Sequence, residues 1–156
     1  MAEIKITPLF HGNMHADRDL LLTGHPSSLL SKSSHAKNKV WCEVPSFTYL
    51  IEHPDGTMLF DASISKHWED EWLPHFKELA PYDEVTEEQK FENALKLAGY
   101  GPEDIDYPFP SHLHCDHAGN ARLFNTVNTK LLVQDKEFTA AANRDADGEF
   151  FLRADY

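Results

Sequence analysis

Three histidines and one aspartate lie close together in the last third of the chain: His112, His114, Asp116 and His117. Imidazole nitrogens and carboxylate oxygens are ligands that zinc and neighbouring metals accept. In an extended segment, side chains alternate between two faces, so His112 and His114 point to the same side. If the chain turns after them, Asp116 and His117 face the same cavity. The spacing therefore predicts two metal ions, one bound by each pair.

The alternative interpretation is a polar loop whose histidines cap helices and bind water. Four ligand-capable residues at defined spacing favour the metal site over this loop. Cys115 lies among them, but alternation along the chain directs its side chain away from the neighbouring histidines. We therefore predict a packed thiol at Cys115 and not a fifth ligand.

Composition limits the class of protein. A chain of 156 residues allows one domain with a core. Its net charge of -12 argues against a nucleic-acid partner and against an anionic membrane surface. No apolar run approaches the roughly 20 residues of a membrane-spanning helix, and the first residues lack the apolar core of a signal peptide. The two cysteines form no C-x-x-C pair and no disulfide framework, so we expect a cytoplasmic protein.

The motif His112-x-His114-x-Asp116-His117 resembles the signature of the metallo-β-lactamase superfamily. The longer stretch from Ser111 to Asn120 is similar to the N-acyl-homoserine lactonases, the quorum-quenching branch. The similarity continues upstream to about residue 40. This resemblance implies an α/β fold, the metallo-β-lactamase-like αβ/βα sandwich. Residues 1–156 would form a single partial domain, the N-terminal half of that sandwich.

The resemblance implies a metal-dependent hydrolase that opens the lactone ring of N-acyl-homoserine lactones. Its cofactors would be two divalent metal ions, with zinc as the first expectation, and its substrate a small acyl lactone. Asp116 would pass a proton to the leaving alkoxide, and the histidines would act as ligands only.

Two other interpretations stay open. One is thioester hydrolysis of the glyoxalase II kind, which the motif by itself does not separate from lactone hydrolysis. The other is a catalytically inactive half-domain. The family takes further metal ligands from downstream, whereas no histidine follows His117 in this sequence. A half sandwich would also leave one apolar sheet face uncovered, so we expect either a longer parent enzyme or a homo-dimer.

The elements that position the motif can be traced from turn signals and periodicity. Residues 46–53 and 57–62 flank Pro54-Asp55-Gly56 and predict a hairpin. Its second strand ends at Asp61, and by resemblance this aspartate orients the metal loop without binding metal. Residues 105–111 lead into the motif as a strand, which Pro108 and Pro110 should make irregular.

The remaining segments carry weaker signals. Residues 3–10 predict a strand, and 11–39 a loop-rich segment that by resemblance lines the entrance for the acyl chain; an ordinary surface loop is the alternative. The four histidines of this region are expected to be solvated or capping: His11, His15, His25 and His35. Further expectations are two short helices in 67–79, a helix over 86–99, a strand at 130–134 and a helix at 135–143.

Overall fold

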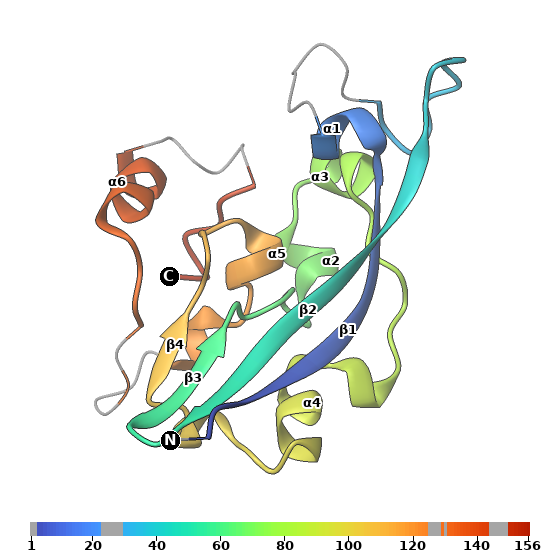
Figure 1. Cartoon of the computed structure of the whole chain (residues 1–156). Helices are drawn as coiled ribbons and strands as arrows, with labels where there is room; N and C mark the ends of the chain where they lie inside the picture. Colours follow the sequence, from blue (N-terminus) through green and yellow to red (C-terminus); the bar gives the residue numbers. More distant parts are fainter. Residues whose placement is uncertain (1–2, 23–29, 125–128, 130, 144–149) are drawn as a thin grey trace.

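The computed structural model describes residues 3–22, 30–124, 129, 131–143 and 150–156. Its centre is a four-stranded sheet in chain order, β1 (Lys5–Asp17), β2 (Trp41–His53), β3 (Gly56–Phe60) and β4 (Tyr107–Phe109). The first three strands pair antiparallel, and β4 pairs with β3 in parallel. Figure 1 shows the two long strands β1 and β2 crossing the molecule, with the short β3 and β4 at one side.

The predicted hairpin is confirmed as β2 and β3. Its turn ends at Gly56, whose φ of 142° lies in a region that residues with a Cβ rarely adopt. The first strand continues past residue 10 to Asp17, with a bulge between Phe10 and Asn13, and α1 (Arg18–Leu22) follows it. Part of segment 11–39 is therefore regular structure. Residues 23–29, including His25, lie outside the described residues.

The helices are short and follow the expected breaks. Pro74 separates α2 (Trp68–Glu71) from α3 (Pro74–Leu79), as predicted. The capping box between Thr86 and Gln89 forms, but it caps the 3-10 turn η2 (Glu87–Gln89), so α4 begins after Lys90. The remaining helical elements are α4 (Phe91–Leu97), η3 (Pro102–Asp104), α5 (Cys115–Ala118), η4 (Ala121–Phe124) and α6 (Asp135–Asn143). None of the described helices has the length and apolarity needed to cross a membrane.

The strand expected at 130–134 is wrong for its described residues, which lie in an irregular segment. This segment still runs beside β4, because the Leu132 N–H donates to the Pro108 carbonyl at 2.9 Å. Because Pro108 has no N–H to donate, β4 cannot form a continuous ladder of hydrogen bonds with the neighbouring segment. The predicted helix at 135–143 is confirmed as α6.

The two faces of the sheet differ. On one face, Leu9, Leu50 and Leu59 are buried in a core with α4. On the other, Phe10 pairs with Phe47 across β1 and β2, and both side chains stay exposed. Further exposed apolar side chains are Ile4, Ile6, Tyr49 and Tyr107. The sequence-based expectation of one uncovered apolar face therefore holds for the described residues.

Candidate metal centre

The motif loop begins where two parallel strands end side by side. Phe60 of β3 pairs with Phe109 of β4, so Asp61 and Ser111 follow neighbouring strand ends. The Asp61 N–H donates to the Phe109 carbonyl at 3.1 Å, which extends the pairing by one step. Residues at the carboxyl ends of adjacent strands share one edge of the sheet, and this edge carries the loop.

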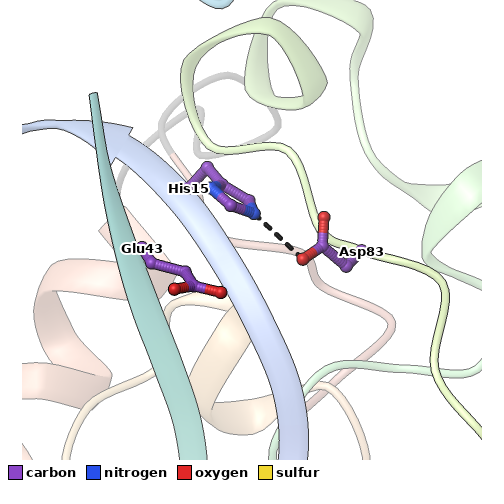
Figure 2. Close-up of side chains that lie close together, drawn as sticks. All are labelled: His15, Glu43 and Asp83. Carbon is purple, nitrogen blue, oxygen red and sulfur yellow. Dashed lines mark hydrogen bonds and ion pairs between the residues drawn. The ribbon is translucent and has the colours of Figure 1, made fainter.

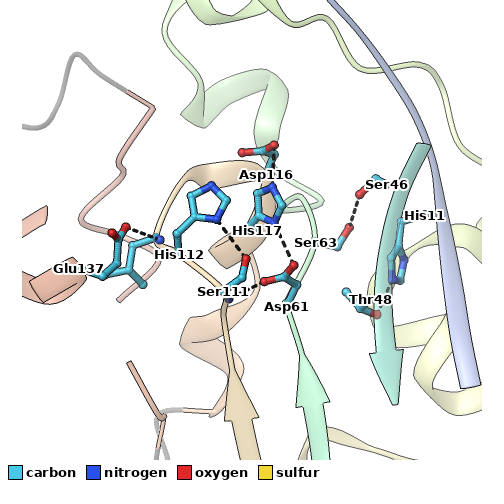
Figure 3. Close-up of polar contacts among 11 residues, drawn as sticks. His11, Ser46, Thr48, Asp61, Ser63, Ser111, His112, Asp116, His117 and Glu137 are labelled. Atoms are coloured by element: carbon cyan, nitrogen blue, oxygen red, sulfur yellow. Dashed lines mark hydrogen bonds and ion pairs between the residues drawn. The ribbon is translucent and has the colours of Figure 1, made fainter. Parts of the chain in front are cut away.

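The three motif histidines converge. The ring centroid of His112 lies 4.5 Å from that of His114 and 4.1 Å from that of His117. Asp116 joins them through its Oδ2, which is 3.3 Å from His117 Nε2. All four side chains are half-buried. The structure thus brings together every residue that the sequence singled out for metal binding (Figure 3 labels three of the four).

Hydrogen bonds from outside the ligand set orient two of the rings. Asp61 Oδ2 lies 3.0 Å from His117 Nδ1, and its Oδ1 accepts the Ser111 N–H at 2.6 Å. Ser111 Oγ lies 3.0 Å from His112 Nδ1. Partners of this kind fix ring orientation and raise ligand basicity. With Nδ1 engaged in both rings, Nε2 is the candidate ligand atom; in His117 it lies 3.3 Å from Asp116 Oδ2, a contact that a metal ion would replace.

The charges of the loop suit a cation. Burial and the neighbouring rings of His117 and His114 lower the pKa of His112, which favours the neutral, metal-binding form. Burial alone would lower the pKa of His117, but hydrogen bonds to Asp116 and Asp61 outweigh it and raise that pKa to about 10. Burial alone would raise the pKa of Asp116, yet its contact with His117 lowers it. Protonated His117 therefore places a positive charge between the carboxylates of Asp116 and Asp61. A metal ion would replace this charge, and His117 would release a proton.

Close backbone contacts hold α5 under the loop. The Ala62 N–H donates to the His117 carbonyl at 2.7 Å, and the Gly119 N–H donates to the Ser63 carbonyl at 2.8 Å. A Cβ on Gly119 would lie 2.4 Å from the Ser65 nitrogen, so only glycine allows this approach. Cys115 is buried at 1% exposure, and burial raises the pKa of its thiol. The prediction of a packed thiol is confirmed.

A cavity of 420 Å³ opens beside the loop. One wall carries the four motif residues, and the rest is lined mainly by apolar side chains from β1, α1, β2 and α2–α3, among them Met14, Leu20, Leu21, Val44 and Trp72. A larger cavity of 520 Å³ lies over residues 63–69 and 82–85 and contains none of the motif residues. The smaller cavity is therefore the one that joins an apolar surface to the candidate metal ligands.

A second group of ligand-capable side chains forms away from the loop. The potential ligand atoms of His15, Glu43 and Asp83 all lie within 4.8 Å of one another (Figure 2). Their present contacts account for them, because His15 Nε2 pairs with Asp83 Oδ2 at 2.9 Å and Glu43 Oε1 accepts a hydrogen bond from Asn13 at 2.7 Å. Both carboxylates are exposed. We assign this group to surface hydrogen bonding, in agreement with the expectation for His15.

Sequence reasoning missed two residues. His11 is 1% exposed, with Nε2 2.9 Å from Thr48 Oγ1, so the expectation of a solvated side chain is wrong. Its Nδ1 lies 2.9 Å from the carbonyl oxygen of Gln89, the last residue of η2, which agrees with the capping alternative. Glu137 on α6 accepts the Leu113 N–H at 2.9 Å, inside the motif. His11 shares the alternation of buried β1 residues, which could have indicated its burial. No local signal marks Glu137, because its partner lies far away in the sequence.

The last strand of this mixed sheet leads into a loop where imidazole and carboxylate groups converge. This arrangement is typical of metal-binding α/β proteins. The model of the metallo-beta-lactamase superfamily matches residues 43–150, and the chain belongs to this superfamily. The predicted metallo-β-lactamase-like fold class is thereby confirmed.

Several similar proteins are lactonases. The N-acyl homoserine lactonase of Bacillus cereus is 34% identical over 133 residues, which are 83% of this chain and 50% of the relative. A second such lactonase, from Agrobacterium fabrum, is 26% identical over 93% of this chain and 52% of the relative. A solved N-acyl homoserine lactone hydrolase, with the product N-hexanoyl-L-homoserine at its catalytic metal centre, superposes with a TM-score of 0.72 at 27% identity. The superposition covers 99% of this chain and 56% of the solved chain. The chain thus spans about half the length of the relatives it matches.

Proposed function

We propose that this chain carries the metal-binding half of a metal-dependent hydrolase that opens the lactone ring of N-acyl-homoserine lactones. The observation that carries the proposal is the convergence of His112, His114 and His117, with Asp61 directing the Nδ1 of His117 away from the centre. The lactonase relatives and the product-bound solved structure support the substrate class.

The donor set fits divalent metal. His112, His114, Asp116 and His117 offer three borderline nitrogens and one hard oxygen, which suit zinc. We propose two zinc ions, held by His112 with His114 and by Asp116 with His117. When bound, such ions supply a hydroxide near neutral pH and polarise a carbonyl. Catalytic zinc sites normally have at least three protein ligands, so each ion needs a ligand beyond these pairs.

The chain's own groups account for the remaining steps. Asp116 is the catalytic residue: its carboxylate is ionised and lies at the edge of the cavity, where it takes a proton and passes it to the leaving alkoxide as the ring opens. The apolar wall of the cavity, with Met14 and Leu20, accommodates the acyl chain. We therefore propose that segment 11–39 lines the entrance for the acyl chain, a proposal supported by its described residues Met14 and Leu20 in the cavity wall.

Thioester hydrolysis and an inactive half-domain are the competing functions. The exposed apolar sheet face and the two ligands offered to each ion favour a site that needs groups beyond the described residues. We propose that this face is covered by the rest of a longer enzyme or by a second copy in a homo-dimer. We further propose a cytoplasmic location, on the absence of a cysteine framework.

The test measures zinc uptake and ring opening together. The purified chain is titrated with zinc against a colorimetric chelator and then assayed on N-hexanoyl-homoserine lactone and on a glutathione thioester. Zinc uptake with lactone opening that Asp116→Asn removes supports the lactonase. Uptake with turnover of the thioester alone supports the competing hydrolase, and uptake without turnover supports the half-domain. Failure to take up zinc at any concentration overturns the metal site and the function with it.

A further inference from the structure

The backbone of the motif loop is held from three separate places. The Ser111 N–H donates to the Asp61 carboxylate after β3, the Leu113 N–H donates to the Glu137 carboxylate on α6, and the Cys115 N–H donates to the Phe150 carbonyl. Asp61 and Glu137 thus bind the N–H groups on either side of His112, which is flanked by residues 111 and 113. Figure 3 shows the Glu137 carboxylate beside the loop, away from Asp61.

Glu137 meets a donor that has no access to water. Leu113 is 0% exposed and lies between the two ligand histidines, so its N–H requires a protein acceptor. A carboxylate gives that N–H a charge-assisted hydrogen bond, which is stronger than one to a neutral acceptor. The helix that carries Glu137 is itself anchored, because Ala141 of α6 is buried in the main core at 0% exposure.

We infer that Glu137 is a positioning residue of the metal centre: it fixes the peptide between His112 and His114 and so sets the separation of their ligand nitrogens. Glu137 is not among the residues that line the cavity beside the loop. The inference rests on the proposed metal-binding function, but the hydrogen bond that carries it exists without metal. Losing an outer hydrogen-bond partner of a metal ligand typically weakens metal binding by about 10- to 100-fold.

Three variants of the full chain test the inference. Glu137→Ala removes the acceptor, Glu137→Gln keeps an amide oxygen in its place, and Thr139→Ala changes an exposed residue of the same helix. Hydrogen exchange of the Leu113 amide is measured in metal-free protein, with α4 amides as the reference for global stability. Cobalt affinity and the visible spectrum of the cobalt-saturated protein are measured in parallel.

We expect faster exchange at Leu113 in Glu137→Ala while α4 amides stay unchanged, because only the local donor is freed. Cobalt affinity should fall by about 10- to 100-fold, with an altered spectrum. Glu137→Gln should restore most of both, and Thr139→Ala should match the unchanged chain. Equal Leu113 exchange in Glu137→Ala and Thr139→Ala, or identical cobalt spectra at saturation, overturns the role of Glu137. Absence of cobalt binding in the unchanged chain counts against the proposed function, and Leu113 exchange then decides the role of Glu137.

Discussion

The motif loop and the surface group of His15, Glu43 and Asp83 contain similar chemistry in different surroundings. Both bring imidazole and carboxylate groups within a few ångströms. In the loop, the side chains are half-buried and outer acceptors hold both ring and backbone, as Asp61 does. In the surface group, both carboxylates are exposed; Asp83 pairs with His15, and Glu43 accepts a hydrogen bond from Asn13.

Proximity of donor atoms does not by itself make a metal site. A site needs ligand atoms that are left available by the contacts of the other atoms and a backbone that keeps them in place. His117 meets this condition through Asp61, which occupies its Nδ1. At His15, Nε2 pairs with an exposed carboxylate, a contact of the kind that contributes little to stability, whereas the carboxylate beside His117 Nε2 belongs to half-buried Asp116, itself a candidate ligand.

The largest effect on metal affinity is expected when candidate ligands are removed from the loop. The double variant His112→Ala/His114→Ala should lose metal affinity by more than the roughly 100-fold that loss of an outer partner costs. Isothermal titration with zinc measures the loss, and His15→Ala is the matched control on the surface group. Zinc uptake that depends on His15 and not on His112 and His114 would reverse the assignment of the two groups.

The next effect comes from the orienting carboxylate. Asp61→Ala removes the acceptor of both Ser111 N–H and His117 Nδ1, so zinc affinity should fall by about 10- to 100-fold. The φ of Asp61 is 65°, which asparagine tolerates better than alanine, so Asp61→Asn keeps the backbone conformation and one acceptor. Zinc titration should rank Asp61→Asn between the unchanged chain and Asp61→Ala. Equal affinities for all three would show that ring orientation does not depend on this residue.

A buried carboxyl beyond the loop should make the stability of the fold depend on pH. Asp155 is 0% exposed, and burial raises its pKa to about 7 against the nearby charge of Arg122. Because the folded-state pKa lies above the unfolded value, stability present below about pH 4 is lost as pH rises through 7.

Chemical denaturation of Asp155→Asn should remove this loss. Its free energy of unfolding should rise relative to the unchanged chain by up to about 1.4 kcal/mol per pH unit between these values. Asp83→Asn, which alters an exposed carboxyl, is the control and should follow the unchanged chain. A parallel pH dependence in Asp155→Asn and the unchanged chain would exclude Asp155 as the source.

The smallest effect is expected at the surface group. His15→Ala should change the free energy of unfolding by less than about 1 kcal/mol, since exposed ion pairs are worth 0–1 kcal/mol. Zinc stoichiometry should stay the same. Thermal denaturation with and without zinc measures both quantities. A zinc-dependent stabilisation that His15→Ala abolishes would instead identify this group as a cation site.

Much of the fold follows from local signals. Pro54-Asp55-Gly56 indicated the hairpin, and Pro74 the break between α2 and α3. Predictions failed at two places: Lys90 is extended, so α4 begins later than expected, and the segment around Leu132 lies beside β4 without forming a strand. Alternation along β1 could indicate that His11 is buried, but not that its partners are the Thr48 hydroxyl on β2 and the Gln89 carbonyl, which lie far away in the sequence.

For the candidate site, the four ligand-capable residues and their order could be read from the sequence, because alternation and spacing act over a few positions. The inward packing of Cys115 could be read from it as well. The groups that hold this loop became visible only in the folded chain. Asp61 lies 50 residues before its partner Ser111, and Glu137 lies 24 residues after its partner Leu113. The physical reason is that side-chain periodicity is local, whereas the acceptor of a buried N–H is chosen by the packing of the whole chain.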